Sequence, residues 1–231
     1  MIFLFLSIGF ALAHWYFVFR EHRKGIVITK PPVMIFLILW VLFTIPDIFS
    51  RTVEIGLLPA WFLWGLVFGL IGDVFLMWPD RFFLPGLLAF LVNQVLYLIG
   101  FGTYYAPNEA PTIQGVLYIF FWITLMIVVY LLFRGMDRSG KTRMKLPVGV
   151  YAVIISMMVV AAIETFFFHW PRNASILVSI GAVSFYVSDI MNAWSHFVGD
   201  IRFGRLKIMS TYHLAQILIT AGIVLAATAY R

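Results

Sequence analysis

The sequence of 231 residues contains no cysteine and few charged residues. Without cysteine the chain has no disulfide bonds, thiolate metal ligands or cysteine nucleophile. Asp, Glu, Lys and Arg make up only 11% of the chain and hydrophobic residues 63%, whereas a soluble domain is roughly a quarter charged and half apolar. Together with a mean hydropathy of +0.99, this composition excludes a water-soluble fold.

The net charge of +6 and the pI of about 9.7 show that the few charges are mainly basic. These cations lie between apolar runs and form no basic segment with a nucleic-acid-binding motif. We therefore expect membrane lipids, and no nucleic acid, as partners. The sequence leaves the oligomeric state open.

Eight apolar runs are each long enough to cross a hydrocarbon core of ~30 Å. The connections between them are too short to hold a soluble domain. We predict an all-α, polytopic membrane protein whose eight transmembrane helices form one domain over residues 1–231. The runs are approximately residues 1–19, 33–49, 57–77, 82–104, 113–133, 147–168, 174–197 and 208–229.

Helix-ending residues mark several of the connections. These are Lys30-Pro31-Pro32, Trp78-Pro79-Asp80-Arg81, Pro107-Asn108-Glu109 and Arg138-Ser139-Gly140-Lys141.

The first apolar run contains Ala11-Leu12-Ala13, which resembles a signal-peptidase site. Its positive residues follow the run instead of preceding it, so we expect a retained helix. Of the 16 Lys and Arg residues, 13 fall in alternate connections that lie on one side of the predicted bundle. Because cytoplasmic loops retain cations, we predict that both termini are non-cytoplasmic. In a bacterium this membrane would be the cell membrane.

A shift of 116 residues superposes several residues of the two halves, 1–115 and 116–231. We interpret the halves as two parallel four-helix repeats. The superposed pairs are Pro31 with Pro147, Gly65 with Gly181, and Asp73 with Asp189.

Asp73 and Asp189 are predicted to lie at similar depth in the cytoplasmic half of their helices. A carboxylate at this depth costs several kcal/mol, so an intramembrane acid is a hypothesis for a functional site. Two other acids, Asp47 and Glu164, fall near the outer helix ends, and we expect them to be interfacial.

Other polar residues support a site around the two aspartates. Asn192 and His196 follow Asp189 at three and seven residues, which places all three on one helix face. Gly65 and Gly69 share a face with Asp73 and favour close approach of another helix. The remaining candidates come from the second, fourth and eighth predicted helices: Lys30, Asn93, Gln94, Tyr97, Tyr212, His213 and Gln216.

Over nearly its whole length the chain resembles the lysoplasmalogenase family of membrane proteins, also called YhhN-like. The resemblance rests on the order and spacing of several short motifs. They are Lys30-Pro31, Gly72-Asp73, Phe83-Leu84-Pro85-Gly86-Leu87, Ala89-Phe90, Tyr97, Gly181-Ala182, Ser188-Asp189, Ser210-Thr211-Tyr212 and Ala215-Gln216. Gln94 and His213 depart from the pattern, since the family usually has a histidine and a tyrosine there.

The resemblance implies a hydrolase that cleaves the vinyl ether bond of lysoplasmalogen to a fatty aldehyde and a glycerophospholipid. It implies catalysis by Asp73 and Asp189, with no cofactor or metal and with Lys30 among the residues that bind the substrate. This chemistry needs an acid and an anion. One of two neighbouring carboxyl groups in an apolar pocket can stay protonated near neutral pH, while its partner is ionised.

Three other classes of protein use related residues. A proton-coupled carrier of a small amphiphile would also place acids near the midplane of a repeat, but no helix shows the paired Gly/Pro break of such carriers. An intramembrane aspartyl protease uses two acids in a different sequence context. A zinc hydrolase would need His14, His196 and His213 together, without the usual i, i+4 histidine pair.

Overall fold

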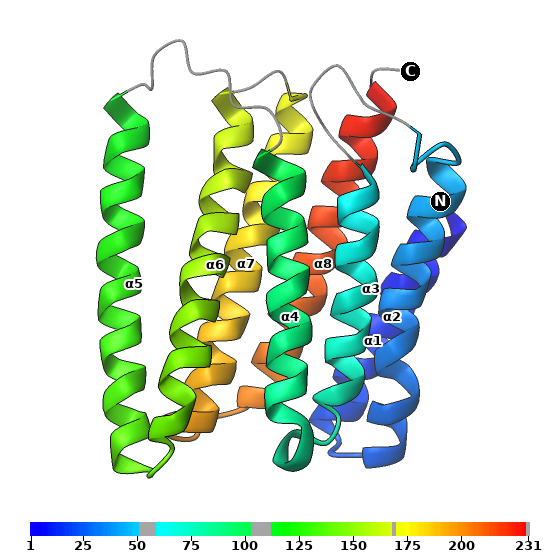
Figure 1. The fold of residues 1–231 in the computed structure, drawn as a ribbon. Helices are drawn as coiled ribbons and strands as arrows, with labels where there is room; N and C mark the ends of the chain where they lie inside the picture. Colours follow the sequence, from blue (N-terminus) through cyan, green and yellow to red (C-terminus); the bar gives the residue numbers. More distant parts are fainter. Residues whose placement is uncertain (51–58, 103–111, 168–169, 230–231) are drawn as a thin grey trace.

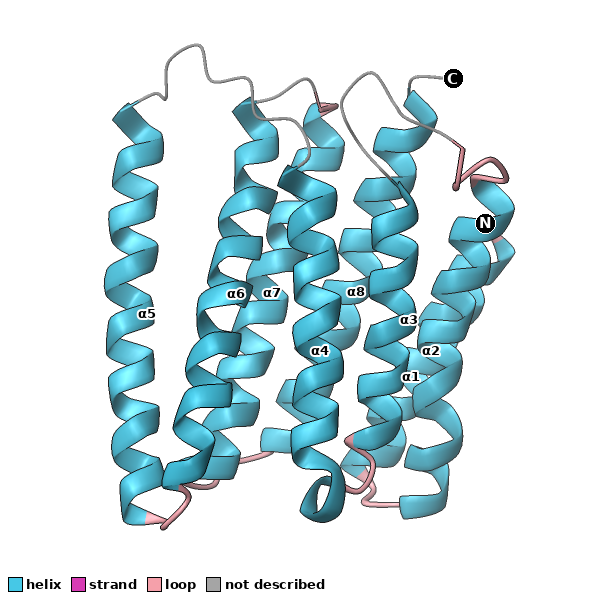
Figure 2. Ribbon diagram, in the orientation of Figure 1, coloured by secondary structure: helices cyan, strands magenta, loops and turns pink. Residues whose placement is uncertain are grey.

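The computed structural model describes residues 1–50, 59–102, 112–167 and 170–229, and all regular secondary structure in these ranges is helical (Figures 1 and 2). Within these ranges eight α-helices run alternately up and down in one bundle (Figure 1). Two short 3₁₀ turns precede and follow α6. The α-helices are α1 (Ile2–Phe19), α2 (Arg23–Thr44), α3 (Pro59–Phe75), α4 (Pro79–Gly102), α5 (Thr112–Arg138), α6 (Lys145–Glu164), α7 (Arg172–Phe197) and α8 (Gly204–Ala229).

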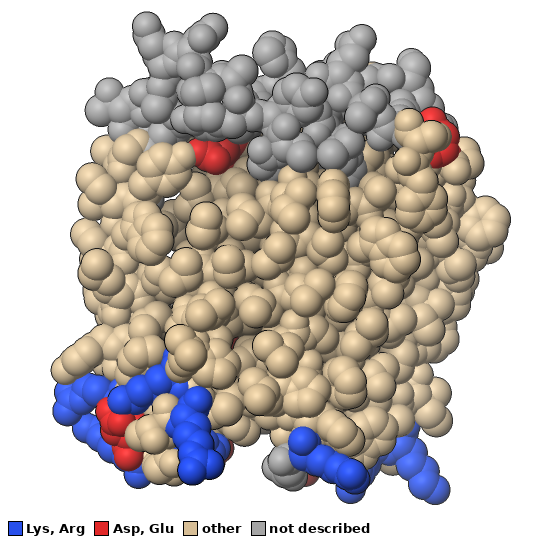
Figure 3. Space-filling model, viewed as in Figure 1, with Lys and Arg blue, Asp and Glu red and all other residues tan. Residues whose placement is uncertain are grey.

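Seven of these helices are long and apolar enough to cross a membrane, and α3 is a shorter apolar helix of 17 residues. The visible face of the bundle carries a wide belt of uncharged residues, with the Lys and Arg residues gathered at one end (Figure 3). At this end α1 leads into α2, α3 into α4, α5 into α6, and α7 into α8. We call it the basic end.

The start of α2 differs from the prediction by a full ten residues. The helix begins at Arg23 and runs through Pro31 and Pro32, so the interpretation of Lys30-Pro31-Pro32 as a connection was wrong. Proline is tolerated inside a transmembrane helix because neighbouring helices and local adjustments satisfy the freed backbone groups. Lys30 therefore lies on a helix inside the bundle, where its side chain is buried.

Of the other predicted connections, Arg138-Ser139-Gly140-Lys141 is confirmed, and Trp78-Pro79-Asp80-Arg81 is confirmed only in part, because α4 already begins at Pro79. Pro79 is the first residue of α4, a position where its missing N–H costs no hydrogen bond. Gly140 has a φ of +69° in the turn between α5 and α6, a conformation that glycine adopts readily. The predicted connection Pro107-Asn108-Glu109 lies outside the described residues.

The two interfacial acids lie at the end opposite the basic end, as predicted. Asp47 is exposed just beyond α2. Glu164 is the last residue of α6 and accepts a hydrogen bond from the hydroxyl of Tyr118. The proposed repeat stays a prediction, since Asp73 lies in the last turn of α3 and Asp189 about two turns before the end of α7.

The helices α7 and α8 pack closely through small residues. A Cβ atom added at Gly222 would lie 2.9 Å from the carbonyl oxygen of Ala174 and 2.6 Å from Cγ1 of Val178. A Cβ atom at Gly181 would lie 2.9 Å from the backbone nitrogen of Ile219. Small residues allow this close backbone approach, which stabilises helix association inside a membrane.

We expect Gly222→Ala to destabilise the bundle by about 1–3 kcal/mol because the new methyl group overpacks this contact. The measurement is the midpoint of thermal unfolding in detergent. Gly9→Ala is the matched control, since a Cβ atom there meets nothing within 4 Å. A midpoint for Gly222→Ala equal to that of the control would contradict the packing argument.

Candidate active site

A cavity of about 1500 Å³ opens at the basic end of the bundle. Its walls come from every helix except α5, and both Asp73 and Asp189 line it. Apolar side chains such as Leu76, Leu87 and Phe90 share the wall with these acids. The cavity can therefore surround both a polar group and an apolar chain.

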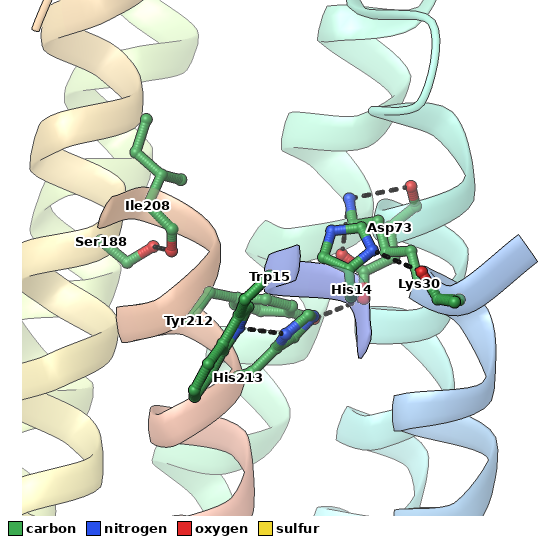
Figure 4. A network of polar contacts seen from close by, with 9 residues as sticks. His14, Trp15, Lys30, Asp73, Ser188, Ile208, Tyr212 and His213 are labelled. Carbon is green, nitrogen blue, oxygen red and sulfur yellow. Dashed lines mark hydrogen bonds and ion pairs between the residues drawn. The ribbon is translucent and has the colours of Figure 1, made fainter. Parts of the chain in front are cut away.

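Asp73 is held by residues from two other helices (Figure 4). The ammonium group of Lys30 lies 3.0 Å from Oδ1 of Asp73 and 3.2 Å from its backbone oxygen. The hydroxyl of Tyr212 donates a hydrogen bond to Oδ2 at 2.9 Å. All three side chains are buried. The ammonium group of Lys30 lies where it would compensate the negative charge of an ionised Asp73.

Asp189 has a different environment, although it lines the same cavity. It is half-buried and accepts a hydrogen bond from the hydroxyl of Tyr151 on α6. Within the described residues, no Lys or Arg nitrogen lies within 4.0 Å of its carboxyl group. Each aspartate thus accepts a hydrogen bond from a tyrosine, but among the described residues only Asp73 has a cation beside it.

The predicted polar face of α7 lines the cavity, with Asn192 and His196 following Asp189 toward the basic end. The imidazole of His196 stacks on the ring of Phe83 from α4, with ring centroids 4.0 Å apart. Asn192 and His196 thus continue a polar wall from the acid to the mouth of the cavity.

Three of the predicted polar residues form a buried layer behind the cavity instead of lining it. Tyr97 donates a hydrogen bond to Oε1 of Gln216 at 2.7 Å, and Asn93 donates one to the backbone oxygen of Gly65 at 2.6 Å. Gly65 and Gly69 make room for these side chains, as the small-residue face of α3 predicted. This layer ties α3, α4 and α8 together.

The two departures from the family pattern point to different neighbours. His213 accepts a hydrogen bond at Nδ1 from the indole of Trp15 at 3.0 Å. Gln94 is fully buried on α4 and lies near Tyr151. Neither residue lines the cavity, so both act behind its wall.

His14 and Tyr151 line the cavity but were not among the predicted site residues. Nothing in the local sequence distinguishes Tyr151, whose partner lies 38 residues away. His14 was a candidate only as a metal ligand of a zinc hydrolase. Its ring lies 5.1 Å from that of His213, whereas His196 stacks on Phe83. Among the described residues, no three His, Asp or Glu side chains are grouped to hold a metal ion.

The chain is similar to proteins that are named lysoplasmalogenases. Lysoplasmalogenase TMEM86A of Bos taurus is 34% identical over 159 residues, which cover 67% of this chain and 61% of the relative. Lysoplasmalogenase TMEM86B of Mus musculus is 35% identical over 173 residues, which cover 74% of this chain and 67% of the relative. The chain thus spans about three fifths to two thirds of the length of these relatives.

No solved structure matches the chain significantly. A profile of the YhhN family matches residues 25–223, which include Lys30, Asp73, Tyr151, Asp189 and Tyr212. The protein is an integral, multi-pass membrane protein, and it belongs to the YhhN family.

Proposed function

We propose that the protein is a hydrolase that cleaves the vinyl ether bond of a lysoplasmalogen. The observation that carries the proposal is a cavity that holds two aspartates with different partners, one paired with Lys30 and one with Tyr151. The names of the relatives give the bond and the substrate class. The products would be a fatty aldehyde and a glycerophospholipid.

The different partners assign the two aspartates different roles. Asp189 has no cation beside it in the described structure and faces the cavity, so it is the proton donor. Asp73 is the anion, because the buried ammonium of Lys30 stabilises its charge. This resembles paired carboxylates in glycoside hydrolysis, where one protonates and the other stabilises a developing cation.

The reaction consumes one water molecule. Asp189 transfers its proton to the vinyl carbon remote from the ether oxygen, which leaves an oxocarbenium-like cation on the carbon bonded to oxygen. Asp73 stabilises this cation electrostatically. Water adds to the cationic carbon and returns a proton to Asp189. The resulting hemiacetal breaks its bond to the glycerol oxygen, which takes up the hydroxyl proton as the aldehyde leaves.

The distribution of cations supports an orientation with the cavity open to the cytoplasm. Cytoplasmic loops retain Lys and Arg, and the visible face of the bundle carries them at the end where the cavity opens (Figure 3). Both termini then lie on the other side of the membrane.

We expect Asp189→Asn and Asp73→Asn each to lower the rate of aldehyde release by about a hundredfold or more, since each removes a group that acts in the transition state. The measurement is fatty aldehyde released from lysoplasmalogen by purified protein. Asp137→Asn is the control, because Asp137 is exposed and paired with Lys145 outside the cavity. Full activity in both cavity variants would rule out the aspartate mechanism. Absence of aldehyde from the unaltered protein would favour a carrier.

Lys30→Met is expected to destabilise the protein by about 3–5 kcal/mol, because it leaves Asp73 as a buried charge without a cation beside it. The double variant Lys30→Met, Asp73→Leu should recover most of the thermal stability while aldehyde release stays lost. Both quantities are measured in the same detergent. If Lys30→Met kept normal stability, the ion pair would not be the source of charge compensation.

The absence of cysteine allows a direct measurement of orientation. Ser139→Cys lies in the exposed turn between α5 and α6 at the basic end, and Ser50→Cys lies in the exposed segment beyond α2 at the other end. In intact cells a membrane-impermeant maleimide should label the cysteine at 50 and leave the one at 139 unlabelled until the membrane is opened. The reverse pattern would invert the orientation.

A further inference from the structure

Three helices begin at the mouth of the cavity, and each carries an arginine in its first turn. The arginines are Arg23 on α2, Arg81 on α4 and Arg205 on α8, and all three line the cavity. Their side chains are exposed, so the guanidinium groups lie where the cavity meets the aqueous phase.

This arrangement concentrates positive charge. The N-terminus of a helix carries about half a positive elementary charge, which disfavours a cation in the first turn. Glu21 and Asp200 also line the mouth, yet in the described part of the chain none of the three arginines forms an ion pair with a carboxylate. Three cations on three positive helix ends repel one another, and a bound anion would offset this repulsion.

The positive-inside distribution explains which end of the bundle is basic, but it does not explain why these arginines surround one opening. Arg20, Arg138 and Arg202 lie at the same end and do not line the cavity. The convergence of Arg23, Arg81 and Arg205 is therefore a property of the site.

His14 provides a second, independent observation in the same cavity wall. It is 0% exposed, and its Nε2 atom has no hydrogen-bond partner. The hydroxyl of Thr29 donates to the backbone oxygen of Gly25 at 2.6 Å, so Nδ1 of His14 must donate to Thr29 at 3.1 Å. With Nδ1 as the donor, Nε2 of a neutral ring is a buried acceptor in the wall of the cavity. An unpaired buried acceptor is costly unless a polar group reaches it.

We propose that the mouth of the cavity binds the phosphate group of an amphiphile through Arg23, Arg81 and Arg205. Planar guanidinium groups bind phosphate oxygens in pairs, so three of them can hold a phosphate diester. The polar linker of the ligand then passes His14, and its chain extends along the apolar wall toward the aspartates. The identity of the amphiphile as a lysophospholipid rests on the proposed function, whereas phosphate binding does not.

The test measures binding without hydrolysis. A 1-O-alkyl lysophospholipid has a saturated ether and cannot undergo vinyl ether cleavage, and a 1-O-alkylglycerol has the same chain without phosphate. Arg205→Gln and Arg23→Gln should each weaken binding of the phospholipid about tenfold, because each removes a charge-assisted hydrogen bond to the phosphate. Binding of the alkylglycerol should not change. Arg205→Lys should retain part of the affinity.

Arg202→Gln is the matched control, because Arg202 is exposed in the same turn and does not line the cavity. The proposal is overturned if Arg205→Gln binds the phospholipid as the unaltered protein does, or if it loses both ligands equally. Thermal unfolding of each variant identifies a folding defect, and a variant with such a defect is replaced by the Lys variant at the same position.

Inorganic phosphate distinguishes a lipid head group from free phosphate. Inorganic phosphate is added to the bound phospholipid at a similar concentration, with chloride of equal ionic strength as the control. If phosphate displaces the phospholipid and chloride does not, the site binds free phosphate and the head-group assignment is overturned. Weak displacement by phosphate supports the head-group assignment. Phosphate-selective binding without aldehyde release would contradict the proposed hydrolase and support the phosphate site. Aldehyde release without phosphate-selective binding would support the hydrolase and contradict the phosphate site.

Discussion

The buried ion pair between Lys30 and Asp73 is the interaction on which the site depends. A carboxylate inside a membrane protein costs several kcal/mol, and here an ammonium at 3.0 Å offsets that cost. The pair joins α2 to α3, and the hydroxyl of Tyr212 joins α8 to the same carboxylate. The position of Asp73 and its charge are therefore determined by three helices together.

This constraint makes the two aspartates unequal. They occupy matching positions in the sequence pattern, yet Asp189 meets the phenol of Tyr151 where Asp73 meets a cation. The vinyl ether hydrolysis that we propose needs an acid and an anion in one cavity. The basic mouth and the apolar wall of the same cavity suit an amphiphile with a negatively charged head group.

Much of the site was predictable where its residues share one helix. Asp189, Asn192 and His196 follow helical spacing and all line the cavity, because the pitch of an α-helix determines which residues share a face. His14 and Tyr151 could not be predicted in this way. Each acts through a contact with another helix, and no local pattern says which helices become neighbours.

By itself the sequence determined the membrane environment and the number of α-helices in the described residues, and it singled out Asp73 and Asp189 as candidate site residues, because hydropathy and the cost of an intramembrane charge are local properties. The start of α2 could not be predicted from local properties, since tolerance of Pro31 and Pro32 inside a helix depends on neighbouring helices. Only the tertiary structure decided the partner of each aspartate. It placed Lys30 inside the bundle against Asp73 and not at the surface, because side-chain pairing across helices follows from their packing.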